Sequence, residues 1–135
     1  MPGAFLDSNV LIYAFTTDAR AGRARELLET GPIISVQSLN EFANVARRKL
    51  GKEWSWLREA LEAIGLFCPS IVPITVETHS MALRIAERHG YAVFDSLIVA
   101  AALEADCDTL WSEDRQHGLV IDRRLRVANP FRTEN

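Results

Sequence analysis

The sequence is poor in the residues that bind zinc or form disulfides. Its two cysteines, Cys68 and Cys107, lie far apart and outside any CxxC pattern. Two isolated thiols are most simply interpreted as reduced, half-buried side chains. The three histidines, His79, His89 and His117, do not have the spacing of metal ligands. The sequence therefore indicates neither a disulfide scaffold nor a zinc site.

Long hydrophobic runs are missing as well. The longest apolar run, residues 97–103, is much shorter than the roughly 18 residues that a membrane helix needs. The N-terminus has no basic leader, and Asp7 stands where a signal peptide would need apolar residues. We therefore expect a cytoplasmic protein that does not contact a membrane. With 135 residues, of which 48% are hydrophobic, the chain can form a single domain over residues 1–135 with its own core.

An excess of positive charge is also absent, since the formal net charge is −3. This balance weakly disfavours a nucleic-acid partner, because phosphate binding needs local positive charge. Basic residues nevertheless gather in three places: Arg20, Arg23 and Arg25; Arg47, Arg48, Lys49 and Lys52; and Arg123, Arg124 and Arg126. Any one of these clusters, taken alone, is most simply interpreted as a solvated face.

The sequence does contain an alternation of short apolar strands and amphipathic helices. Strands are predicted at residues 4–6, 33–35, 71–74, 109–111 and 124–131, with the last at an edge of the sheet. Helices are predicted from about residue 9, around 21–28, 39–50 and 57–64, and over 76–89 and 95–105. The helix at 95–105 is apolar nearly all round, so it should be the most buried. This order predicts an α/β domain with a mainly parallel sheet.

Acidic residues stand where the predicted strands end or the following helices begin. Asp7 follows the first strand, Glu41 lies in the first turn of the helix after the second strand, and Asp95 begins the buried helix. Glu113 and Asp114 follow the strand at 109–111. In an open parallel sheet these points share one edge, where such folds bind their ligands. We therefore expect the acids to converge.

Each acid also has a simpler structural interpretation. Asp7 or Ser8 could cap the first helix, and Ser38 and Glu41 have the S-x-x-E spacing of a capping box. Asp95 could cap its own helix, and the acid at 114 could lie in an ordinary polar turn. Ser, Thr and Asn cap helices equally well, however, so nothing local demands an acid at all of these ends.

Clustered carboxylates point to a cation, because they repel one another unless one lies between them. Hard oxygen ligands without cysteine or histidine partners suit Mg²⁺ or Mn²⁺. Such ions commonly serve phosphoryl chemistry, which indicates a nuclease or a phosphatase. A phosphatase of the phospho-aspartate type would carry a second aspartate two residues after its nucleophile. Asp7 is followed by Ser8 and Asn9, which counts against that class.

Several segments together resemble the PIN-domain ribonucleases, especially the VapC-like toxins of toxin–antitoxin pairs. The first two motifs are matched by "FLDSNVLIYAF" and "SVQSLNEFANVARRK", and the third and fourth by "YAVFDSLIVAAALEADCDTLWSED". The tail from "QHG" to "VANPF" is also similar, so the resemblance covers nearly the whole chain. The sequence departs from the pattern at Phe94, where Trp is frequent, and at Ser96, where Ala is usual. Neither departure affects the acids.

The resemblance implies a fold, an activity and partners. Its metal-binding and catalytic residues would be Asp7, Glu41, Asp95 and Asp114, supported by Asn9, Ser112 and Glu113. Which of the two adjacent acids, Glu113 or Asp114, points inward is open, and the motif favours Asp114. The resemblance further implies a three-layer α/β/α sandwich, a homodimer, and an antitoxin whose tail occupies the acidic groove. The implied activity is Mg²⁺- or Mn²⁺-dependent endonucleolytic cleavage of RNA by a metal-activated water.

Two alternatives remain open at this stage. One is a PIN nuclease that processes RNA without being a toxin, and the other is a binding module that keeps the acids but turns over poorly. A possible RNA contact is Arg48, which lies seven residues after Glu41 and therefore on roughly the same face of its helix. Its guanidinium could hold an RNA phosphate that leads into the site.

Overall fold

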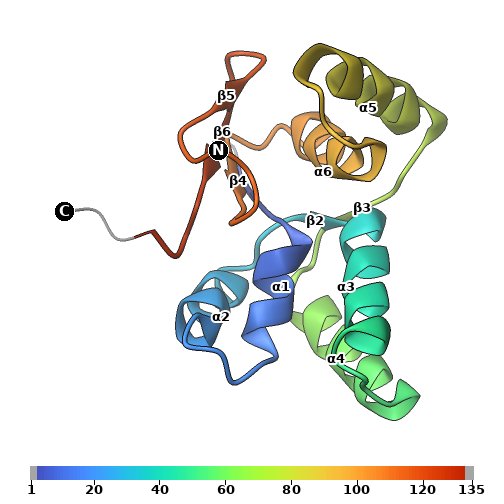
Figure 1. Cartoon of the computed structure of the whole chain (residues 1–135), viewed down its shortest axis with the longest axis vertical. Coiled ribbons are helices and arrows are strands. Elements are labelled where there is room, and N and C mark those ends of the chain that lie inside the picture. Colours follow the sequence, from blue (N-terminus) through green and yellow to red (C-terminus); the bar gives the residue numbers. More distant parts are fainter. Residues whose placement is uncertain (1–2, 133–135) are drawn as a thin grey trace.

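The computed structural model describes residues 3–132, which form six short strands and six helices (Figure 1). The elements follow one another as β1 (Ala4–Leu6), α1 (Ser8–Ala14), α2 (Ala21–Glu29), β2 (Ile34–Ser35), α3 (Val36–Arg48), α4 (Trp54–Phe67), β3 (Ile71–Val72), α5 (Val76–His89), α6 (Val93–Glu104), β4 (Thr109–Trp111), β5 (Val120–Ile121) and β6 (Leu125–Ala128). This order confirms the predicted alternation. Within the described residues, no helix is long and apolar enough to span a membrane.

The strands form a mainly parallel layer. Four of them pair in the order β1-β4-β6-β5, and β2 pairs with β3. A parallel bridge between Phe5 and Ile33 joins β1 to the segment that leads into β2. Every strand pair is parallel except β5 with β6. Because Leu6 of β1 lies opposite Trp111 of β4, the residues that follow these two strands emerge side by side at one edge of the sheet.

The helices cover both faces of this layer, as the predicted three-layer sandwich requires. Figure 1 shows α5 and α6 grouped apart from α1 to α4, with β2 and β3 between the two groups. Successive side chains of a strand point to opposite faces. Accordingly, Phe5 packs into the apolar core beneath α5 and α6, whereas its neighbour Leu6 packs into the core beneath α1 to α4. The three-layer α/β/α prediction is confirmed.

Two helices illustrate how local signals set the element boundaries. The predicted helix at 76–89 is found as α5, which ends at Gly90 with a φ of 72°, a left-handed conformation that glycine adopts readily. The predicted most buried helix is α6, in which every residue from Ser96 to Leu103 is buried. It begins at Val93, two residues earlier than the sequence indicated.

The prediction for the last strands is wrong in one respect. β6 is an interior strand between β4 and β5, and the two-residue β5 was not predicted. The connection between β5 and β6 places Asp122 and Arg123 at φ values of 52° and 60°. A hairpin connection of this kind is normally signalled by Asn or Gly, which readily adopt positive φ. That signal is missing here, so the hairpin was not recognised.

Both cysteines are free, as predicted, but they are fully buried rather than half-buried. Burial raises the pKa of the Cys68 thiol and of the Cys107 thiol to about 11. Both side chains therefore act as small apolar groups in the core at neutral pH.

Candidate functional site

Asp7 lies at the point where β1 ends and α1 begins. Its Oδ1 accepts a hydrogen bond from the backbone N–H of Ser8 at 2.7 Å, so it does cap α1. Its Oδ2 accepts a second hydrogen bond, from Ser112 Oγ at 2.8 Å, across the gap to the end of β4. Asp7 is only 3% exposed, and this burial raises its pKa above the usual range although Arg115, Ser112 and Ser8 act to lower it. Capping alone does not explain a carboxylate this deeply buried.

Glu41 is connected to Asp7 through a serine hydroxyl. Ser8 Oγ donates to Glu41 Oε1 at 2.7 Å and lies 3.4 Å from Asp7 Oδ1. Gln37 Nε2 donates to Glu41 Oε2 at 3.2 Å. Burial raises the pKa of Glu41, and the charges of Asp7 and Asp95 add to that effect. Gln37 was not predicted as part of the site, although its place one helical turn before Glu41 is a usable signal.

The capping-box interpretation of Ser38 and Glu41 is wrong. The capping box of α3 is formed by Ser35 and Ser38, whose side chains bond each other's backbone N–H at 3.3 and 3.1 Å. The helix therefore begins at Val36, and Glu41 lies in its second turn rather than its first. Because Ser38 supplies the reciprocal hydrogen bond of the box, the carboxylate of Glu41 is available to face Asp7.

Asp95 lies in the first turn of α6, where its side chain is 56% exposed. It does not cap the helix, since the N-cap residue is Ala92. Instead it faces Arg115, whose Nη2 lies 3.9 Å from Asp95 Oδ1 and 3.3 Å from Asp7 Oδ2. The same nitrogen donates to the backbone oxygen of Asp95 at 3.1 Å. Sequence reasoning missed Arg115, because an arginine in a polar turn is ordinarily a surface charge.

The two adjacent acids after β4 have different surroundings. Glu113 accepts a hydrogen bond from Tyr13 Oη at 2.7 Å and forms an ion pair with Arg20 at 2.8 Å, so it faces α1 and α2. Burial and the bond to Glu113 raise the pKa of Tyr13 to about 12. Asp114 is exposed, and its charge contributes to the raised pKa of Asp7. Asp114 as the metal-binding acid of the two stays a prediction.

Two of the three predicted supporting residues, Asn9 and Ser112, hold the ends of β1 and β4 together. Asn9 Nδ2 donates to Ser112 Oγ at 3.4 Å, and Asn9 Oδ1 accepts from the backbone N–H of Glu113 at 3.4 Å. Ser112, which is fully buried, donates in turn to Asp7. Asn9 and Ser112 therefore orient the buried carboxylate of Asp7.

Asp7, Glu41 and Asp95 lie in one region, but they do not form a closed set of ligands. Within residues 3–132, no three side chains of Asp, Glu, His or Cys are arranged so that they could hold a metal ion. The donor set itself fits a hard divalent cation, because it consists of carboxylates without thiols. A positive charge already lies between Asp7 and Asp95 in the form of the Arg115 guanidinium. In charge and in donor chemistry, the residues present therefore suit a cation at this position.

Arg48 lies away from these contacts. It is exposed in the last turn of α3 and borders a shallow groove together with Asn44, Arg47 and Trp54. The axial rise between Glu41 and Arg48 is about 10 Å, from 1.5 Å for each residue of a helix. Its role in binding RNA stays a prediction.

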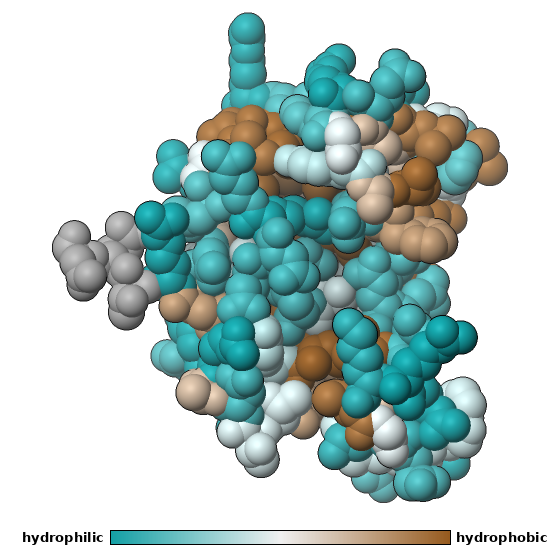
Figure 2. Space-filling view, in the orientation of Figure 1, coloured by the Kyte–Doolittle hydropathy of each residue, from teal (hydrophilic) through white to brown (hydrophobic). Residues whose placement is uncertain are grey.

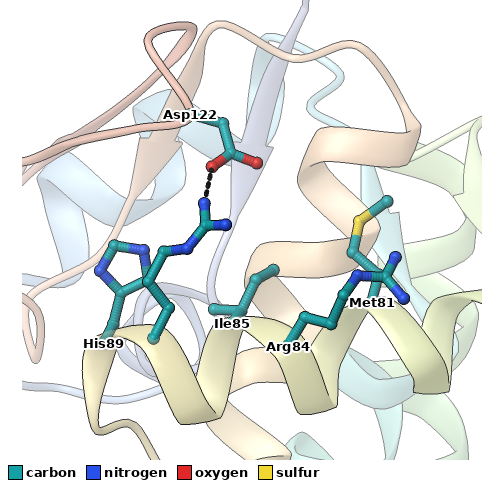
Figure 3. Close-up of a pocket in the computed structure, with 6 residues that line it drawn as sticks. Met81, Arg84, Ile85, His89 and Asp122 are labelled. Atoms are coloured by element: carbon teal, nitrogen blue, oxygen red, sulfur yellow. Dashed lines mark hydrogen bonds and ion pairs between the residues drawn. The ribbon is translucent and has the colours of Figure 1, made fainter.

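A separate cavity of about 120 Å³ contains none of the predicted site residues. Its lining comes from α5 and from the turn between β5 and β6, as Figure 3 shows. The ion pair between Arg88 and Asp122, at 3.3 Å, connects these two walls. The acidic region described above is therefore the better candidate for a functional site.

A sequence model of the PIN domain matches residues 4–120. The chain belongs to the PIN-domain family. The predicted family is thereby confirmed, and PIN domains in general use a divalent metal ion, which agrees with the carboxylates found here. A search of curated protein sequences finds no match to this PIN domain.

Solved structures with the same fold include two toxin-related proteins. One is VapC20 of Mycobacterium tuberculosis, a toxin that cleaves the sarcin-ricin loop, with a TM-score of 0.65 and 20% identity over 82% of this chain and 89% of that chain. Another belongs to a toxin–antitoxin complex from Klebsiella pneumoniae, with a TM-score of 0.72 and 20% identity over 96% of this chain and 99% of that chain. At this level of identity the similarity establishes that this PIN domain shares their fold.

Proposed function

We propose that this PIN domain is a metal-dependent endoribonuclease and the toxin of a type II toxin–antitoxin pair. The observation that carries the proposal is the carboxylate of Asp7, buried at the carboxyl end of β1 and linked through Ser8 to Glu41 and through Arg115 to Asp95. VapC20, which has the same fold, cleaves the sarcin-ricin loop. RNA is therefore the proposed substrate, and the cytoplasm is the proposed location.

The proposed metal ligands are Asp7, Glu41, Asp95 and Asp114, with Mg²⁺ or Mn²⁺ as the ion. A divalent ion bound there would supply the Lewis acidity and the positive charge that phosphodiester hydrolysis requires. The other side chains position the ligands: Ser112 and the backbone of Ser8 orient Asp7, and the Ser8 hydroxyl and Gln37 orient Glu41. Asn9 and Glu113 support this arrangement from α1 and from the loop after β4.

The activity can be tested on the purified chain with structured RNA. We expect cleavage with Mg²⁺ or Mn²⁺ and none with a chelator, because the carboxylates alone supply no electrophile. Gel electrophoresis of end-labelled RNA measures the products. Metal-dependent binding of RNA without any cleavage would instead support the binding-module alternative.

Arg48→Ala should weaken RNA binding without changing the fold, because Arg48 is exposed and its backbone is helical. If its guanidinium contacts one phosphate, the slope of log K against log salt should fall by about 1. Fluorescence anisotropy with labelled RNA at several salt concentrations measures both effects. Arg84→Ala, an exposed arginine on α5, is the control. An unchanged slope for Arg48→Ala would leave Arg48 as a surface charge only.

The proposed protein partner is an antitoxin with a basic segment. Four carboxylates at one edge of the sheet attract positive charge, so a basic segment would compete with the metal ion for the same carboxylates. The matched structure from Klebsiella pneumoniae is a complex of a toxin with its antitoxin. We expect the product of a neighbouring gene to co-purify with this chain and to lower its nuclease activity. A complex in which these carboxylates still bind Mn²⁺ would contradict this mode of binding.

A second copy of the chain is the other proposed partner. Figure 2 shows apolar side chains gathered over α5 and α6, while hydrophilic side chains cover much of the centre of this view. Exposed apolar residues on these two helices include Val76, Leu83, Val93 and Phe94, the last with 66% of its surface accessible. Large exposed apolar patches commonly mark protein interfaces. This surface supports the proposal of a homodimer.

A further inference from the structure

We propose that Arg115 is a built-in cation that occupies the metal position of the acidic site and must leave before a divalent ion can bind. This inference rests on the proposed function, since it takes Asp7 and Asp95 as metal ligands. It goes further by assigning to the chain itself a residue that sets how much metal is needed to load the site.

The contacts of one nitrogen carry the argument. Arg115 Nη2 lies 3.3 Å from Asp7 Oδ2, 3.9 Å from Asp95 Oδ1 and 3.1 Å from the backbone oxygen of Asp95. These oxygens come from two elements that are distant in sequence, the start of α1 and the start of α6. The side chain of Arg115 is 7% exposed, and that of Asp7 is 5% exposed. A buried cation with oxygen partners from both elements takes the place that a metal ion would take.

The guanidinium of Arg115 also has fewer and longer polar contacts than a purely structural arginine would have. Nε of Arg115 is buried and has no hydrogen-bond partner among residues 3–132. By contrast, Arg20 forms ion pairs of 2.8 Å with both Asp18 and Glu113. A buried arginine is normally held by several short hydrogen bonds, because a buried donor without a partner is costly. Arg115 therefore neutralises the acids while remaining easier to displace than Arg20.

Arg115 and a divalent ion exclude each other at this position, because two cations that share the same carboxylate oxygens repel. The guanidinium also lies between Asp7 and Asp95, which keeps these carboxylates from meeting around a smaller ion. The apparent affinity for metal is then reduced by the fraction of time for which the site is open. The parent protein should consequently load only at metal concentrations well above those that the acids alone would require.

The first test compares metal binding by three proteins without using nuclease activity. Isothermal titration with Mn²⁺ is carried out on the parent, on Arg115→Met and on Arg88→Met. Arg88 is the matched control, because it is a surface arginine that pairs with Asp122 at 3.3 Å, and Asp122 is not one of the proposed metal ligands. We expect Arg115→Met to bind Mn²⁺ at least about tenfold more tightly than the parent, as follows if Arg115 occupies the site nine-tenths of the time. Arg88→Met should bind like the parent.

The second test uses the unmodified protein, so it does not depend on how a variant folds. Phenylglyoxal reacts with accessible guanidinium groups, and mass spectrometry locates the modified arginines. Arg115 should be protected in chelator and should become reactive when Mn²⁺ is added. Arg88, with 70% of its side chain exposed, should react equally in both conditions.

The outcomes separate this inference from the proposed function. If Mn²⁺ binds equally to the parent and to Arg115→Met, and Arg115 stays protected with the metal bound, the displacement of Arg115 is overturned while the metal site stands. If neither protein binds Mn²⁺, the proposed metal-dependent function is overturned and this inference with it. Tighter binding by Arg115→Met together with metal-induced labelling of Arg115 supports the inference.

Discussion

Asp7→Asn and Asp95→Asn are each expected to lower the rate of RNA cleavage by at least about 100-fold. Removing a residue that only hydrogen-bonds to a metal ligand already lowers metal affinity or activity by about 10- to 100-fold. Each change replaces a proposed anionic ligand by a neutral amide of the same shape. The fold should survive Asp7→Asn, because Asn is as good an N-cap as Asp and can still accept the hydrogen bond from Ser8. It should survive Asp95→Asn because the side chain of Asp95 is 56% exposed and does not cap α6. Initial rates of cleavage of a labelled RNA at saturating Mn²⁺ measure the effect. Asp106→Asn, at an exposed position, is the control.

The same two variants should also differ from the parent in how their melting temperatures respond to chelator and to Mn²⁺. Because burial raises the pKa of Asp7, the contribution of this group to stability is present below its unfolded pKa and is lost as the pH rises through its folded pKa. Asn carries no charge, so Asp7→Asn avoids the cost of burying an ionised carboxylate at neutral pH. In chelator, this variant should therefore melt no lower than the parent. Excess Mn²⁺ should raise the melting temperature of the parent and much less that of either variant. If both variants melt lower in chelator and metal shifts no melt, Asp7 and Asp95 are structural and the nuclease proposal fails.

Phe42→Ala is expected to lower the free energy of unfolding by about 3–5 kcal/mol. Phe42 is fully buried between α3 and its neighbours. Its ring stacks on Trp56 with centroids 6.2 Å apart, and it meets the ring of Phe15 edge-on at 5.5 Å. The change would leave a cavity in the core that holds α3 against α1 and α4. Since Glu41 is the preceding residue on this helix, the proposed nuclease activity should fall together with stability.

Urea unfolding followed by tryptophan fluorescence measures the stability of Phe42→Ala, and circular dichroism provides an independent probe. Leu66→Ala is the control, because Leu66 is 86% exposed on α4 and its loss should change stability by no more than about 0.5 kcal/mol. Equal stabilities of the two variants would show that the aromatic cluster does not hold α3 in place.

Part of the candidate site could be predicted from the sequence, because an acid at the end of a strand or the start of a helix can be recognised without knowing its contacts. Asp7, Glu41 and Asp95 stand close to the expected strand ends and helix starts, and the structure brings them within electrostatic reach of one another. The capping of α3 was not predictable in the same way. Several serines and an acid around its start satisfy the local pattern, and the choice of Ser35 with Ser38 depends on where β2 ends.

The sequence by itself determined the alternation of strands and helices, the extent of α5 and the burial of α6, because these follow from side-chain periodicity and from glycine at a helix end. Only the tertiary structure decided that β6 is an interior strand, that Glu113 turns to Tyr13, and that Arg115 lies between Asp7 and Asp95. These contacts join residues that are tens to about a hundred positions apart in the chain. Neither periodicity nor capping signals extend beyond a few turns, so only the packed sheet and helices can bring such partners together.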